Sequence, residues 1–152
     1  MLRLTKLTDY GILLMTHMAA SENALHTAAG LSEATRVPLP TVSKILQMLL
    51  HEGLLKSIRG ARGGYRLARP AADITVQDVI NTFEGSIALT ECNLDGCECE
   101  QLPDCTTSGN WQRINGAVRQ VMQMITLADM ASPDFTPVFR MERTIPLREA
   151  RG

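Results

Sequence analysis

Apolar residues in the first third of the chain follow the spacing of three short helices. Residues 5–20 and 27–35 each begin with a hydroxyl residue that can cap a helix and then place apolar side chains on one face. Residues 36–40 hold two prolines, which disfavour helical geometry in the residues before them, so a turn is predicted there. Pro40 fits the first turn of a third helix that Gly53 ends. The pattern predicts a helix-turn-helix arrangement, although packed helices in any small α-helical domain would look similar.

The next stretch changes from helical spacing to strand alternation. Residues 54–59 and 65–68 alternate between apolar and polar positions, and the glycine-rich residues 60–64 lie between them, so a β-hairpin is predicted. The segment from Gly53 to Ala72 contains no acidic residue and carries five basic ones: Lys56, Arg59, Arg62, Arg66 and Arg69. A basic hairpin directly after a helix-turn-helix pattern favours a wing on DNA phosphates or in a minor groove over a merely solvated surface.

The second half of the chain contains two predicted helices separated by a long irregular segment. Residues 74–85 have helical spacing and end at Gly85, whereas residues 86–110 follow neither period. A last helix is predicted to begin near 108–110, with apolar residues at alternating steps of three and four that are typical of two packed helices: Trp111, Ile114, Val118, Val121, Ile125 and Ala128. Because this helix follows the compact part, we expect it to form a homodimer interface.

These elements predict a mainly α fold with a small β-hairpin, a winged helix-turn-helix domain followed by a long dimerisation helix. The expected divisions are a DNA-binding domain at 1–85, a cysteine-rich loop at 86–110, the dimerisation helix at 111–131 and a flexible tail at 132–152. The stretches of apolar residues are too short for a membrane span, and no secretion signal is evident, so a cytoplasmic protein with no membrane partner is expected.

The formal net charge of -1 conceals two regions of opposite sign. Residues 1–75 hold nine Lys and Arg against five Asp and Glu, whereas residues 76–152 hold six against eleven. The basic half contains the predicted helix-turn-helix and wing, and the acidic half contains all four cysteines. The two halves are therefore predicted to face different partners.

The cysteines are spaced Cys92-x4-Cys97-x-Cys99-x5-Cys105. A reducing compartment disfavours structural disulfides, and the paired knuckles typical of zinc sites are matched only loosely. Thiolates on an irregular loop can surround an iron–sulfur cluster. From spacing alone, a cluster is somewhat favoured, while zinc and free thiols stay open.

Four segments together resemble one family, the bacterial iron–sulfur regulators that include the cluster assembly regulator IscR and the nitric-oxide-sensitive repressor NsrR. They are LRLTKLTDYG near the N-terminus, the wing RGARGGYRLARP, the following ITVQDVINTFEG, and a cysteine loop that ends six residues before Trp111. The resemblance covers about residues 1–131. The branch that regulates the sulfur-mobilisation (SUF) cluster assembly genes looks closest.

The resemblance implies a 2Fe-2S or 4Fe-4S cluster held by Cys92, Cys99 and Cys105. Cys97 is an extra cysteine, which leaves open a spare thiol, an alternative ligand or a redox-reactive group. The assembly regulators have a histidine ligand where this chain has Ser108. In the nitric-oxide sensors an acidic residue from the partner subunit's first helix is the fourth ligand, and Asp9 stands at that position.

The resemblance also implies DNA contacts at the start of the third helix and in the wing: Pro40, Thr41, Ser43, Lys44, Arg59, Arg62 and Gly63. A dimer would then bind a pseudo-palindromic double-stranded operator. The resemblance implies a transcription regulator, with repression as its expected mode, that senses cluster status or redox and nitrosative stress and controls SUF genes. The alternatives are a nitric-oxide-sensing repressor and a zinc- or thiol-based DNA-binding regulator without a cluster. An enzyme is not expected, because phosphate-loop, zinc-protease and nucleophile-elbow motifs are absent from the sequence.

Overall fold

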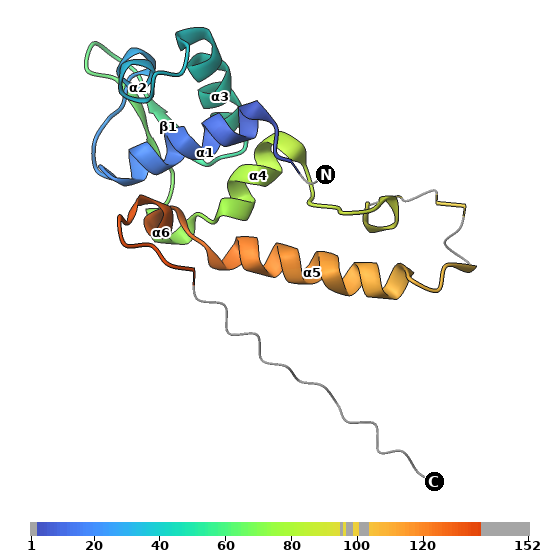
Figure 1. Ribbon diagram of the computed structural model, residues 1–152. Helices are drawn as coiled ribbons and strands as arrows, with labels where there is room; N and C mark the ends of the chain where they lie inside the picture. The colour runs from blue at the N-terminus through green and yellow to red at the C-terminus, as the bar shows by residue number, and fades with distance from the viewer. Residues whose placement is uncertain (1–2, 95, 97–98, 101–103, 138–152) are drawn as a thin grey trace.

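The computed structural model describes residues 3–94, 96, 99–100 and 104–137. Helix α1 crosses the middle of the molecule, with α2, α3 and the hairpin on one side and α4, α5 and α6 on the other (Figure 1). The elements in chain order are α1 (Lys6–Ala19), α2 (Ala28–Thr35), α3 (Leu39–His51), β1 (Leu55–Ile58), β2 (Gly64–Leu67), the 3-10 turn η1 (Ala71–Asp73), α4 (Val76–Glu84), the 3-10 turn η2 (Glu91–Asn93), α5 (Ser108–Met124) and α6 (Leu127–Ala131). The predicted mainly α architecture with one small hairpin is confirmed.

The first three helices begin where their capping residues predict. The Thr5 side chain accepts the N–H of Thr8 at 3.3 Å, and Thr27 accepts the N–H of Gly30 at 3.0 Å. Both bonds satisfy donors that the first turn of a helix leaves unpaired. Pro40 lies in the first turn of α3, where its missing N–H removes no hydrogen bond.

The hairpin between β1 and β2 is antiparallel, with Ile58 opposite Gly64 at the turn end. Gly63 is required at this turn because an added Cβ would lie 2.2 Å from the Ile58 carbonyl oxygen. His26 exchanges two backbone hydrogen bonds, of 2.9 and 2.8 Å, with Tyr65, which lies one residue from the turn end of β2. The wing is therefore attached to the chain segment just before α2.

One hydrophobic core joins α1, α3, the hairpin and α4. Its fully buried side chains come from α1, α3, α4 and the residue before α4, which belong with α2 and the hairpin to the winged unit (residues 6–84), and from α6: Leu14, Met15, Val42, Ile45, Leu46, Leu49, Ile74, Val79 and Leu127. Helices α1 and α4 approach closely at Gly11, where a Cβ would lie 2.3 Å from the Phe83 ring. The helix-turn-helix is thus fixed by packing on several sides.

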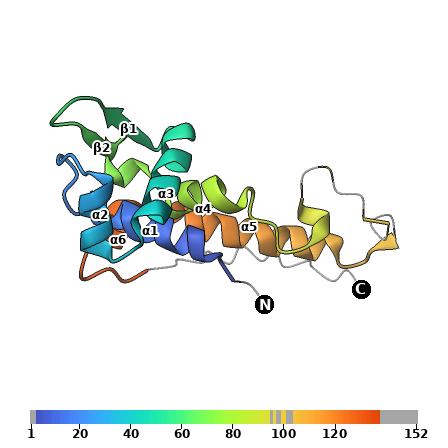
Figure 2. The ribbon, with the colours of Figure 1, turned by 90° about the horizontal axis from the view of Figure 1, so that it is seen from above.

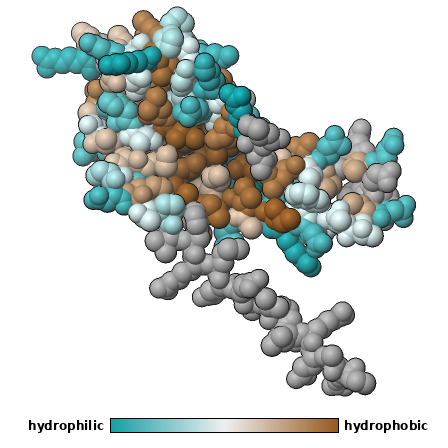
Figure 3. All heavy atoms as spheres, in the orientation of Figure 1, coloured by the Kyte–Doolittle hydropathy of each residue, from teal (hydrophilic) through white to brown (hydrophobic). Residues whose placement is uncertain are grey.

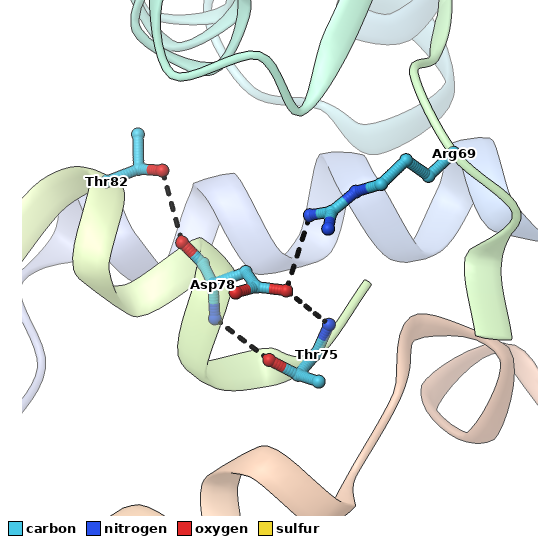
Figure 4. A network of polar contacts seen from close by, with 4 residues as sticks. All are labelled: Arg69, Thr75, Asp78 and Thr82. Atoms are coloured by element: carbon cyan, nitrogen blue, oxygen red, sulfur yellow. Dashed lines mark hydrogen bonds and ion pairs between the residues drawn. The ribbon is translucent and has the colours of Figure 1, made fainter. Parts of the chain in front are cut away.

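A reciprocal capping box starts α4. Thr75 donates its N–H to the Asp78 carboxylate at 3.0 Å, and Asp78 donates its N–H to the Thr75 hydroxyl at 3.1 Å (Figure 4). The same carboxylate pairs with Arg69 at 3.5 Å, and Thr82 donates to the Asp78 carbonyl at 3.2 Å. The guanidinium group of Arg69 therefore has a partner within the chain, the Asp78 carboxylate.

The last predicted helix is interrupted, which corrects the continuous stripe expected through Ala128. Ile125 has extended geometry, and α6 begins anew after Thr126. The Val76 N–H donates to the Ile125 carbonyl and the Leu127 N–H to the Ile74 carbonyl, each at 2.8 Å. These backbone bonds tie the α5–α6 junction to the segment before α4 and prevent one continuous helix. Within the described ranges, no helix has the length and apolar character to cross a membrane.

Candidate functional site

The predicted DNA-contacting residues of the third helix gather at its N-terminal end. Pro40 and Lys44 are exposed, and Thr41 and Ser43 are half-buried. The opposite face of the same helix is anchored in the core by Val42, Ile45, Leu46 and Leu49, so its exposed end is held rigidly. This arrangement presents hydroxyl and ammonium groups that can contact bases and phosphates.

The wing lies beside α3, on the side of the molecule away from α5 (Figure 2). Arg59 and Arg62 are exposed at its turn, while Gly63 is half-buried and makes the close backbone contact described above. The structure therefore brings the two predicted groups of DNA-contacting residues to one side. Gly63 has a clear conformational role there.

The described parts of the cysteine loop lie at the N-terminal end of α5, where η2 packs beside that helix, away from α2, α3 and the hairpin (Figure 1). Cys92 is half-buried in η2, and its Sγ lies 3.0 Å from the Thr90 hydroxyl. Cys99 is also half-buried. Cys97 lies outside the described residues.

Cys105 lies just before α5, which begins at Ser108. Its Sγ lies 3.5 Å from the Thr107 hydroxyl, and that hydrogen bond, with the Thr107 backbone, lowers the pKa of the Cys105 thiol. A lowered pKa raises the thiolate fraction at neutral pH, the form that binds metals and reacts with oxidants.

The donor chemistry of this loop suits a thiolate-bound group, but one subunit does not gather all the predicted ligands. Among the residues that the structure describes, no three Cys, His, Asp or Glu side chains form a group that could hold a metal ion. Asp9 is exposed in the first turn of α1. In the part of the chain that the structure describes, Asp9 and the three predicted cysteine ligands are therefore not gathered into one metal-binding group.

Two polar networks near this loop were not predicted from the sequence. Asn115 is only 4% exposed and bonds to the backbone of residues 87 and 89. Glu84, at the end of α4, accepts hydrogen bonds from the Thr8 hydroxyl and from the Thr5 N–H at 2.9 Å. The Thr8 hydroxyl first, and then the Thr5 backbone, lower the pKa of Glu84. A signal for Asn115 existed: it lies four residues after Trp111, within an otherwise apolar stripe.

Known proteins match this chain over nearly its whole described length. A family profile described as "Rrf2: Iron-dependent Transcriptional regulator" matches residues 4–133. Protein aau3 of Rhizobium meliloti (strain 1021) is 32% identical over 147 residues, covering 95% of this chain and 96% of that protein.

Two solved structures share the fold. CymR (YrzC), described as the global cysteine regulator of B. subtilis, has a TM-score of 0.68 and 28% identity, covering 86% of this chain and 97% of its own. T. potens IscR has a TM-score of 0.65 and 29% identity, covering 85% of each chain. The family profile, the relatives and the winged helix agree: the chain is a transcriptional regulator, not an enzyme, and belongs to the Rrf2 family.

Proposed function

We propose that this regulator is a homodimer that binds a pseudo-palindromic operator and senses its signal through an iron–sulfur cluster held by the cysteine loop. Its family membership implies DNA binding. The observation that carries the proposal is the separation of two chemistries: exposed basic groups on the α3 and wing side, and three half-buried thiols near the start of α5. Such a protein would act where the bacterial chromosome lies, in the cytoplasm.

The DNA-facing set is formed by Pro40, Thr41, Ser43, Lys44, Arg59, Arg62 and Gly63. In a two-fold dimer, two copies of α3 would enter successive major grooves about 34 Å apart. The arginines of the wing would neutralise phosphates or enter the minor groove, and the hydroxyls of α3 would contact base edges.

The dimer proposal is supported by the apolar side chains that α5 leaves uncovered. Trp111 and Ile114, in the first two turns of α5, are 40% and 47% exposed, whereas Asn115, Val118 and Met122 further along the helix are buried or half-buried. An open groove of about 420 Å³ lies between α4, residues 86–89 and α5, and Figure 3 shows apolar side chains gathered in a band across this face. A second copy of α5 would cover these groups.

The cluster proposal assigns Cys92, Cys99 and Cys105 as ligands, with Asp9 of the partner subunit as the fourth and Cys97 as an additional thiol. Because Asp9 lies in the first turn of α1, a contact across the dimer would connect the loop of one subunit to the winged unit of the other. A bound 2Fe-2S or 4Fe-4S cluster would supply a redox- and nitric-oxide-sensitive group at this connection.

The test is anaerobic purification followed by visible spectroscopy and analysis of iron and acid-labile sulfide. We expect a brown protein, and Cys92→Ala, Cys99→Ala and Cys105→Ala should each remove the colour and the iron, while Asp9→Ala should weaken cluster retention. A colourless protein with stoichiometric zinc would exclude the cluster. Titration with nitric oxide distinguishes a nitrosative signal from a cluster-status signal.

A second candidate is a thiol-based regulator without metal. It is supported by the structural likeness to the global cysteine regulator and by the hydrogen bond of Thr107 to Cys105. This version predicts no iron, and a loss of DNA affinity on treatment with peroxide that Cys105→Ser prevents.

The proposed targets are SUF genes for cluster assembly. Genome-wide mapping of bound sites tests this part separately, because a cluster-binding protein found only at unrelated promoters would leave the sensing proposal intact and exclude the target proposal.

A further inference from the structure

The ligand-bearing loop has an attachment to α5 that is separate from its covalent connection. Asn115, two turns into α5, accepts the N–H of Leu89 through Oδ1 at 3.0 Å and donates from Nδ2 to the carbonyl of Ile87 at 3.1 Å. The side-chain amide thus satisfies two backbone groups two residues apart. In a parallel sheet the N–H and C=O of one residue make the same pair of bonds to the neighbouring strand. Asn115 is the buried residue of α5 among those described.

The residues that follow Leu89 in the chain form a second set of polar contacts, around the first cysteine. The Thr90 hydroxyl lies 3.0 Å from the Cys92 Sγ and accepts a hydrogen bond from the Asn93 side-chain amide at 2.6 Å. The Asn93 N–H also donates to the Thr90 carbonyl at 3.0 Å, which closes the turn η2 around Cys92. Residues 87 and 89 are therefore bonded to Asn115, and the hydrogen-bonded turn around Cys92 follows them directly in the chain and packs against α5.

The other end of the loop is fixed to the same helix. The Cys105 carbonyl accepts the Ser108 hydroxyl at 3.1 Å at the start of α5. Both Cys92 and Cys105 are consequently positioned with respect to α5, one through Asn115 and the other through the helix start.

We propose that Asn115 is a positioning residue that sets the place of Cys92 relative to Cys105, so that α5 acts as the common support of both thiols. The role of Cys92 as a ligand rests on the proposed function above. The positioning itself is a property of the metal-free chain and is tested there.

The test compares Asn115→Ala and Asn115→Leu with wild type, and with Gln112→Ala as the control that removes an exposed amide from the same helix. The leucine variant keeps the side-chain volume if the alanine variant folds poorly. In reduced, metal-free protein, both Asn115 variants should increase hydrogen exchange of the peptide spanning residues 86–91 by about tenfold, because two hydrogen bonds are lost. Alkylation of Cys92, followed by mass spectrometry, should accelerate several-fold relative to Cys105.

Unchanged hydrogen exchange and an unchanged ratio of Cys92 to Cys105 alkylation would overturn the proposal. Equal acceleration of exchange and alkylation at all sites in the leucine variant would also overturn it, because it would indicate general destabilisation. Iron loading is measured separately under anaerobic conditions. If wild type binds no iron, the cluster proposal fails whatever the exchange shows. If wild type binds iron, the Asn115 variants should retain less of it than Gln112→Ala.

Discussion

The winged unit and the cysteine loop are built in opposite ways. The winged unit places its proposed DNA-facing groups at the start of α3 and on the hairpin turn, and α3 and both strands contribute side chains to one shared core. The cysteine loop has short turns and a few polar bonds, and its adjoining helix α5 buries one polar residue, Asn115, among those described. A DNA-reading surface benefits from rigid support, whereas a sensing loop needs arrangements that are close in free energy.

The largest expected difference between the two regions is the loss of stability when an apolar side chain is truncated. Leu46→Ala in α3 removes a fully buried side chain and should lower the free energy of unfolding by about 2–5 kcal/mol. Ile114→Ala in α5, where the side chain is largely exposed, should instead lower the melting temperature by an amount that depends on protein concentration, because its proposed partner is a second subunit. Chemical and thermal denaturation at several concentrations measures both. Equal, concentration-independent losses would remove the contrast and the proposed α5 interface.

The next effect concerns the wing turn. Gly63→Ala places a methyl group against the Ile58 carbonyl oxygen, so the turn must change shape and DNA affinity should fall by more than about tenfold. Ala61→Ser, at an exposed position of the same turn, is the control and should bind normally. Fluorescence anisotropy with operator DNA measures the affinity. Normal binding by Gly63→Ala would show that operator affinity does not depend on the shape of the wing turn.

The elements of the winged unit could be predicted because local signals and tertiary packing agree there. Thr5 and Thr27 cap the helices that their positions suggested, and Pro40 lies in the first turn of α3. The break at Ile125 could not be predicted, because an apolar residue fits a helical stripe equally well and the interruption comes from backbone bonds to residues 74 and 76.

The DNA-facing residues could be predicted more completely than the cysteine loop, because local sequence signals determine the first site and tertiary packing determines much of the second. Arg59 and Lys44 could be assigned from a motif whose fold then places them on one side. The cysteines could be recognised by type and spacing, but the role of Asn115 depends on which face of α5 turns inward. Only the packing of residues 87–89 against that helix decides this.

A smaller effect is expected from a single charge of the wing. Arg59→Ala should weaken operator binding several-fold and reduce the slope of log affinity against log salt by about one, because one fewer phosphate is neutralised. Asp9→Ala, which removes an exposed charge outside the wing, should leave the slope in the metal-free protein unchanged. An unaltered slope for Arg59→Ala would place this arginine outside the DNA interface.

The smallest expected effect lies at the junction of the two regions, where Glu84 joins the end of α4 to the start of α1. Hydrogen bonds from Thr8 and Thr5 lower the pKa of Glu84 in the folded protein, so its contribution to stability is present above its ordinary value of 4.5 and is lost as the pH falls through the depressed value. The free energy of unfolding of wild type should therefore decrease more between pH 6 and strongly acidic pH than that of Glu84→Gln, with the two variants closest at low pH. Because Glu84 is exposed, solvent screening keeps this difference modest. Parallel pH profiles would show that the carboxylate adds nothing as an ion, and the contact between α1 and α4 would then depend on apolar packing such as that of Gly11 against Phe83.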